Sequence, residues 1–136
     1  MNETFCEEGN ENMQKPCMDQ YQLGRLGEDA VLEEYLALGY TCLGRRVRCR
    51  QGEIDLIMQD AYGTVVFVEV KTRRLPGFGS VEAVHAKKMK AMRNAAAEWL
   101  RSTEGFYEVR FDVVEAIYHE NGFEFEFVMG VEDAAC

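Results

Sequence analysis

Two short apolar segments each carry a pair of charged residues two positions apart, Glu53 with Asp55 and Glu69 with Lys71. Side chains two positions apart in a β-strand share one face of the sheet. The sequence between the segments, QDAYGT, is turn-prone, so the pattern predicts an antiparallel hairpin. From the length of this turn we expect Asp55 to lie opposite Glu69, which would place Glu53 opposite Lys71.

Two carboxylates placed directly across a strand pair repel each other, by about 0.2–1 kcal/mol relative to a neutral pair. A sheet that keeps Asp55 and Glu69 on one face therefore predicts a cation between or beside them. Mg²⁺ suits such hard oxygen ligands, because it usually binds one or two carboxylates and completes its shell with water and phosphate oxygens. The backbone carbonyl of Val70 could supply one more oxygen. The pattern predicts a divalent-metal site at Asp55, Glu69 and Val70.

Two further residues could take part in chemistry at such a site. The ammonium of Lys71 could orient an attacking water and offset the charge that develops on phosphorus. Glu28 lies at the edge of the apolar stripe of a predicted helix, from which it could reach the sheet. The alternative is a cross-strand ion-pair patch on a half-exposed sheet, because an acidic residue two before a lysine is a common pattern. The apolar strands weaken this alternative, since carboxylates buried in them need partners.

Basic residues are concentrated in the middle of the chain. The formal net charge is −9, yet 12 of the 15 basic residues lie in positions 41–101. Charges farther apart than about 8 Å are largely screened at physiological ionic strength, so the local balance decides whether a phosphate can bind. Solvated faces that balance the acidic ends are the alternative. The candidate nucleic-acid-binding residues are Arg45, Arg46, Arg48, Arg50, Arg73, Arg74, Lys87, Lys88 and Lys90.

The sequence predicts helices and strands that would position these residues within one α/β domain. A chain of 136 residues suffices for one domain. Residues 1–18 show no period and are predicted to be a disordered acidic leader before a single domain at 19–136. Gly24 and Gly27 lie on or beside the stripe of the first helix, where they would let it approach a neighbouring backbone. The predicted elements are a helix at 21–38, a strand beginning at 40–43, a hairpin of strands 53–58 and 65–71, a loop at 75–79, a helix at 81–102, and strands at 109–118 and 123–127. The strand at 65–71 is apolar on both faces and should be central.

Three segments carry a family resemblance: GRLGEDA at 24–30, GEIDLI at 52–57 and VFVEVKTR at 66–73. In these segments the chain resembles the YraN-like family of small uncharacterised proteins. The resemblance implies a restriction-endonuclease-like fold, which is a mixed β-sheet flanked by helices, so that 19–136 would be a nuclease-like domain. It also implies the PD-(D/E)XK nuclease arrangement, Mg²⁺ or Mn²⁺ as cofactor and a nucleic-acid substrate. The residues that match this arrangement are Glu28, Asp55, Glu69 and Lys71.

These observations predict an endonuclease that hydrolyses phosphodiester bonds in DNA or RNA with the help of a metal ion, on branched, single-stranded or other unusual structures. The alternative is a nucleic-acid or protein binding module that keeps the nuclease fold without physiological cleavage. The retained polar residues favour the enzyme, whereas the acidic net charge of −9 favours the module. Metal binding by variants of Asp55 and Glu69 would distinguish the two.

Other sequence features bear on the cellular location and the partners of the protein. No apolar run approaches the roughly 20 residues that span a bilayer, so we expect no membrane partner. The five cysteines are odd in number and lack a C-x-x-C pair, which favours reduced thiols and a cytoplasmic location. The alternating phenylalanines Phe123, Phe125 and Phe127 form an apolar strand that could pair with a second copy, making a homodimer a hypothesis.

Overall fold

The computed structural model describes residues 18–74 and 86–131. Within these residues the chain forms two helices and five strands. In chain order the elements are α1 (Gln20–Ala37), β1 (Thr41–Cys49), β2 (Gly52–Gln59), β3 (Val65–Arg73), α2 (Ala86–Arg101), β4 (Val109–His119) and β5 (Gly122–Val128).

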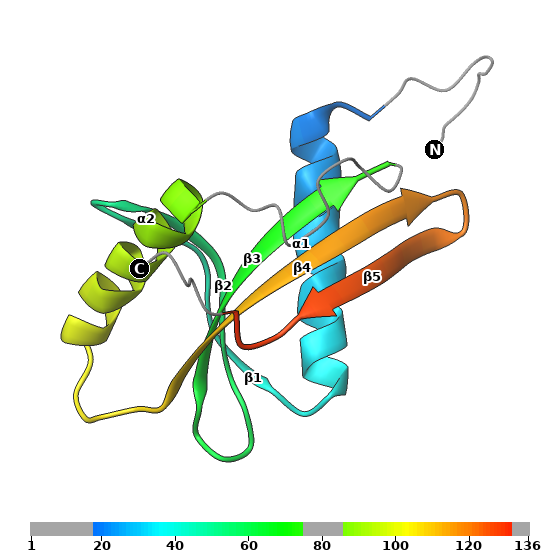
Figure 1. Cartoon of the computed structure of the whole chain (residues 1–136). Helices are drawn as coiled ribbons and strands as arrows, with labels where there is room; N and C mark the ends of the chain where they lie inside the picture. The colour runs from blue at the N-terminus through cyan, green and yellow to red at the C-terminus, as the bar shows by residue number, and fades with distance from the viewer. Residues whose placement is uncertain (1–17, 75–85, 132–136) are drawn as a thin grey trace, which may run out of the picture.

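The strands form one sheet in the order β1-β2-β3-β4-β5. Neighbouring strands are antiparallel except β3 and β4, which are parallel and lie on either side of α2 in the sequence. Helix α1 packs on one face of the sheet and α2 on the other (Figure 1). The predicted α/β class, a mixed sheet flanked by helices, is confirmed, and β3 is central as its apolar faces indicated.

Each face of the sheet has its own apolar core. On one face Met89 and Met92 of α2 pack around the buried ring of Phe67. On the other face Val31 and Tyr35 of α1 pack against buried valines of β3 and β4. Strand β3 contributes to both cores because its side chains alternate between the two faces. A charged side chain in β3 therefore lies in apolar surroundings on either face.

Helix α1 is capped at its start and lies close to the sheet in its second turn. Asp19 accepts a hydrogen bond from the backbone N–H of Gln22 at 2.8 Å in a capping box. A Cβ atom added to Gly27 would lie 2.8 Å from Cγ2 of Thr72 on β3, and closer still to its hydroxyl oxygen. A Cβ atom added to Gly24 would meet nothing within 4 Å. The predicted close approach is thus confirmed at Gly27 and wrong at Gly24.

One strand is longer in the structure than predicted. Some other predictions concern residues that the structure does not describe. The strand expected to begin at 40–43 becomes β1 and continues to Cys49, so most of the arginine-rich segment belongs to a strand. The predicted loop at 75–79, the first turn of the helix predicted at 81–102 and the leader up to residue 17 lie outside the described residues.

Strand β5 forms one edge of the sheet. Its phenylalanines are partly buried against the α1-side core, and Glu124 and Glu126 between them are exposed. The homodimer through this strand stays a prediction. Neither of the described helices is long and apolar enough to cross a bilayer.

Candidate metal and nucleic-acid site

The β2–β3 hairpin opens at the row of Asp55 and Glu69. The two strands pair from Gln59 opposite Val65 to Leu56 opposite Val68, and this confirms the predicted register over the paired residues. The same register would next place Asp55 opposite Glu69, but the ladder ends one row before. We call this end of the ladder the fork.

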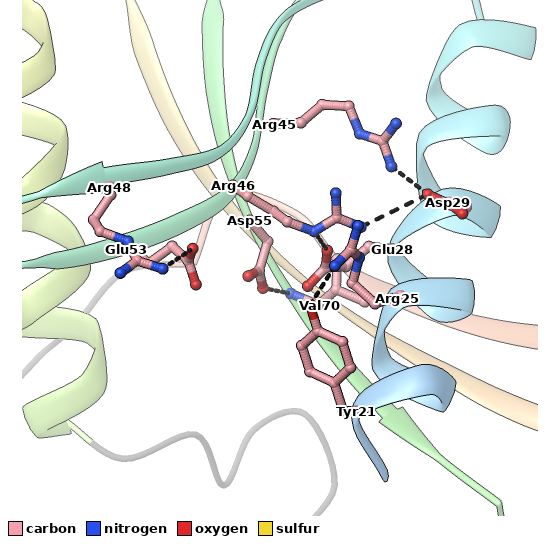
Figure 2. A network of polar contacts seen from close by, with 10 residues as sticks. All are labelled: Tyr21, Arg25, Glu28, Asp29, Arg45, Arg46, Arg48, Glu53, Asp55 and Val70. Carbon is pink, nitrogen blue, oxygen red and sulfur yellow. Dashed lines mark hydrogen bonds and ion pairs between the residues drawn. The ribbon is translucent and has the colours of Figure 1, made fainter. Parts of the chain in front are cut away.

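The side chain of Asp55 takes the place of the missing ladder contact. Its Oδ2 atom accepts a hydrogen bond from the backbone N–H of Val70 at 2.8 Å (Figure 2). A buried backbone N–H needs an acceptor, so this bond compensates for the lost pairing. It also directs the Asp55 carboxylate toward Val70 of β3, the residue next to Glu69.

The pairing of β2 with β1 is irregular at the same row. Arg45 pairs with Leu56 and Val47 with Ile54, but the intervening row of Arg46 and Asp55 is not paired. Arg46 has a φ of 47°, which only glycine adopts easily. Residues held in such conformations cost about 1–3 kcal/mol and cluster at functional sites. Arg46 and Asp55 thus lie in an unpaired row between β1 and β2, at the point where the β2–β3 ladder ends.

The packing of β2 shows the same irregularity. Ile54 and Ile57 belong to the core beside α2, whereas Leu56 belongs to the core beside α1. Regular alternation would put Ile54 and Leu56 on one face. The strand therefore twists at Asp55, which explains how a residue between two apolar side chains can bring its carboxylate into the fork.

Glu69 is almost fully buried, with 4% of its surface exposed. Burial, followed by the negative charge of Asp55, raises its pKa from 4.5 to about 7. Oε2 lies 3.4 Å from the ammonium of Lys88 on α2, and the charges of Lys88 and Lys71 act in the opposite direction. The two lysines thus compensate only part of the cost of burying this carboxylate.

Burial also raises the pKa of Asp55. The hydrogen bond from Val70 and the charge of Lys88 lower it, and the charge of Glu53 raises it. The charge of Asp55 raises the pKa of Glu69, and both carboxylates interact with Lys88, as expected for two acids in one poorly solvated site. Their surroundings favour the approach of a further positive charge.

Glu28 of α1 reaches the same region from the other side of the sheet plane. Burial, and then the charge of Asp55, raise its pKa. Its Oε1 atom forms an ion pair with Nε of Arg46 at 2.8 Å (Figure 2). The close contact of Gly27 with Thr72 brings this turn of the helix against the sheet. This arrangement agrees with the prediction that Glu28 could reach the sheet.

Glu53 departs from the expected arrangement. It was expected opposite Lys71, but its cross-strand neighbour is Arg48 on β1, whose Nη2 lies 3.6 Å from its Oε2. The reason is the fork: the β2–β3 ladder includes Leu56 but no earlier residue of β2, so Glu53 pairs with β1 and not with β3. Lys71 lies on β3 two residues after Glu69, near enough for its charge to act on that carboxylate.

The predicted phosphate-binding residues divide into several groups. Arg46 and Lys88 are held at the candidate site by Glu28 and Glu69. Arg73 pairs with the buried Glu115 at 2.6 Å. The others lie elsewhere: Arg45 pairs with Asp29 of α1, Arg48 with Glu53, Arg74 donates to the carbonyl of Met18, and Arg50 and Lys90 are exposed. The side chain of Lys87 lies outside the described part of the chain.

The ion pairs of Arg46 with Glu28 and of Lys88 with Glu69 were not predicted from the sequence. Arg46 and Lys88 were expected to bind phosphate, and the structure places them on Glu28 and Glu69. A left-handed arginine in a strand has no sequence signature. The approach of α2 to β3 depends on tertiary packing, so no spacing rule could have paired Lys88 with Glu69.

The site offers a small set of hard oxygen ligands. Within 18–74 and 86–131, no three His, Cys, Asp or Glu side chains are arranged to hold a metal ion by themselves. A cation bound by Asp55 and Glu69 would need backbone or solvent oxygens in addition. Mg²⁺ commonly takes one or two carboxylates and keeps several waters, so the donor set is suited to this ion.

Similar proteins place the chain in a family. The uncharacterised protein family UPF0102 matches residues 27–116. The UPF0102 protein of Corynebacterium efficiens is 43% identical over 119 residues, which cover 86% of this chain and 97% of that protein. That of Mycolicibacterium smegmatis is 49% identical over 96 residues, which cover 68% and 77% of the two chains.

Among solved structures, a chain of the EndoMS–dsDNA2 complex is 20% identical, with a TM-score of 0.36. The match covers 75% of this chain and 38% of the EndoMS chain. The family resemblance seen in the sequence is confirmed by the matches to UPF0102 proteins, and the family match at residues 27–116 begins within α1, includes the fork and ends within β4. The chain belongs to the uncharacterised, YraN-like protein family UPF0102.

Proposed function

We propose that this protein is a metal-dependent endonuclease that hydrolyses phosphodiester bonds in DNA or RNA. The observation that carries the proposal is the fork, where the carboxylate of Asp55 turns toward β3 beside the buried Glu69. Two carboxylates in so little solvent need a cation, and the ammonium of Lys88, 3.4 Å from Glu69, compensates them only in part. A divalent ion with a bound phosphate would meet this need.

Asp55, Glu69 and the backbone carbonyl of Val70 would hold one Mg²⁺ or Mn²⁺. The N–H and C=O groups of one residue point to the same side of a strand. Because the N–H of Val70 faces Asp55, its carbonyl faces the fork as well. When bound there, the ion would lower the pKa of a bound water and neutralise charge on the scissile phosphate.

The side chains around the fork would orient the reactants. Lys71 would hold the attacking water and offset negative charge on phosphorus. Glu28 would accept a hydrogen bond from that water, with Arg46 keeping its carboxylate in place at 2.8 Å. Lys88 would exchange its contact with Glu69 for one with the substrate once a divalent ion neutralises that carboxylate.

Calorimetric titration with Mn²⁺ tests the metal site. The comparison uses the wild type, Asp55→Asn and Glu69→Gln, with Glu126→Gln as a control carboxylate that is exposed on β5. We expect one Mn²⁺ per wild-type chain, binding at least tenfold weaker in the first two variants, and wild-type binding in the control. Unchanged binding in both fork variants would remove the metal site and the catalytic proposal with it.

A cleavage assay tests the reaction itself. Labelled single-stranded, duplex and branched DNA and RNA are incubated with Mg²⁺ and the wild type, Asp55→Asn or Lys71→Met. We expect cleavage of at least one structure by the wild type and none by either variant. If four to six phosphates are contacted, duplex affinity should fall with salt at a log–log slope of about −3.5 to −5.5. A slope near zero would contradict the phosphate contacts.

A binding module without cleavage is the second candidate function. The net charge of −9 favours it, because a strongly acidic chain is repelled by nucleic acid outside its basic segment. Mn²⁺ binding that depends on Asp55 and Glu69, together with intact substrates in every cleavage assay, would support this candidate over the enzyme.

A further inference from the structure

A groove lies between α1 and β1, next to the fork. Its volume is about 560 Å³. It shares Arg46 with the candidate site, because that side chain lines the groove and also pairs with Glu28 (Figure 2). The lining includes Tyr21, Arg25, Leu26 and Asp29 of α1 and Arg45 and Arg46 of β1.

The groove is positively charged although the chain is acidic. Three arginines and one aspartate line it, a formal balance of +2 against −9 for the whole chain. Asp29 pairs with Arg45, and its Oδ1 lies 3.9 Å from Nη2 of Arg46. The side chain of Asp29 is 55% exposed, and exposed ion pairs contribute little to stability. A phosphate could therefore share or replace Asp29 as the partner of these arginines.

The groove also carries an aromatic ring and an aliphatic side chain in contact with solvent. Tyr21 is 69% exposed and Leu26 is 42% exposed. The guanidinium of Arg25 lies 5.4 Å from the centroid of the Tyr21 ring and donates a hydrogen bond to its hydroxyl. An exposed aromatic ring beside cations is the combination with which proteins bind single strands, since bases stack on the ring and phosphates contact the charges.

We infer that this groove binds one nucleotide of a single-stranded nucleic acid, with its base on Tyr21 and its phosphate between Arg25 and Arg45. The inference rests on the proposed function for the identity of the ligand, because Arg46 connects the groove to the fork. A duplex keeps its bases stacked within the helix and could not offer one to Tyr21. The groove therefore selects a single strand or the unpaired part of a branched structure.

Fluorescence anisotropy with a labelled thymidine 12-mer in EDTA tests the base contact. Tyr21→Ala should weaken binding about tenfold, within the range measured for base–aromatic stacking, and leave the salt slope unchanged. The control is Tyr62→Ala, which removes another exposed tyrosine (94%) at the β2–β3 turn. An equal loss in both variants, or no loss in Tyr21→Ala, would overturn the inference.

Two charge variants test the phosphate contact. Arg45→Ala should weaken binding and reduce the log–log salt slope by about 0.7, the value for one phosphate contact on a single strand. Asp29→Asn should tighten binding, because the balance of the groove rises by one positive charge; a merely structural ion pair predicts no such gain. Arg101→Ala at the exposed end of α2 serves as the control. Weaker binding by Asp29→Asn would contradict the phosphate contact.

The outcomes separate this inference from the proposed reaction. A duplex 12-mer bound as tightly as the single strand, or no binding of either by the wild type, would overturn the groove inference. If Tyr21→Ala binds the single strand normally while Asp55→Asn loses Mn²⁺ and cleavage, the groove inference fails alone. If Tyr21→Ala weakens binding but no Mn²⁺ binds to the wild type, catalysis fails and the groove stands.

Discussion

Glu69 should make the metal-free protein less stable as the pH rises. Burial and the charge of Asp55 raise its pKa from 4.5 to about 7 in the folded chain. An acid with a higher pKa in the folded state holds its proton more tightly there than in the unfolded state. The stability that it contributes is therefore fully present below pH 4.5 and is lost as the pH rises through 7.

The size of the effect follows from the two pKa values. A rise from 4.5 to about 7 corresponds to about 3 kcal/mol, at about 1.4 kcal/mol for each pH unit. Total unfolding free energies of domains are about 5–15 kcal/mol, so a change of this size is easily measured. Glu69→Gln cannot titrate and should lack this part of the pH dependence.

Urea denaturation followed by circular dichroism, in EDTA at pH values from 4.5 to 8, measures the effect. The wild type should lose about 3 kcal/mol relative to Glu69→Gln across this range, whereas the control Glu126→Gln should follow the wild type. Excess Mg²⁺ at pH 8 should restore stability to the wild type but not to Glu69→Gln. A difference between wild type and Glu69→Gln that does not change with pH, or that changes in the opposite direction, would refute the reasoning.

Four other substitutions test the framework around the site. Lys88→Met removes the cation 3.4 Å from Glu69 and should move the loss of stability to a pH above 7 in the same urea series; an unchanged midpoint would contradict the contact. Asp112 is fully buried and accepts four hydrogen bonds, so Asp112→Ala should lower the unfolding free energy by about 3–5 kcal/mol, and a loss below about 1 kcal/mol would argue against the network. Gly27→Ala should lower the unfolding free energy by about 1–3 kcal/mol, because the added methyl group would contact β3. Gly24→Ala, whose methyl group would lie in open space, should raise the unfolding free energy by about 0.5–1 kcal/mol. Thermal melts that rank the two variants in the other order would contradict the packing of α1.

The hairpin and its register could be predicted from the sequence because the information is local. Strand alternation and the turn between the strands are enough to align Asp55 with Glu69, and the observed pairing from Leu56 to Gln59 agrees with that alignment. The central place of β3 also follows from local sequence, since a strand apolar on both faces must be covered on both.

The separation of the strands at Asp55 could not be predicted in this way. A ladder that continued through this row would have placed Glu53 opposite Lys71. Instead the left-handed backbone of Arg46, with a φ of 47°, and the hydrogen bond from Val70 to Asp55 interrupt the sheet. The conformation of Arg46 depends on α1 packing against the strands, because Arg46 is held by Glu28 of that helix.

Sequence by itself determined which residues carry charge on apolar strands, their order along one hairpin and the family to which they correspond. Tertiary structure alone decided which cations meet those carboxylates: Lys88 comes from α2 and Arg46 turns toward α1. It also brought Tyr21 and Arg45 to one groove. The physical reason is range, since side-chain periodicity acts over a few residues, whereas these contacts join segments that only the packing of helices on the sheet brings together.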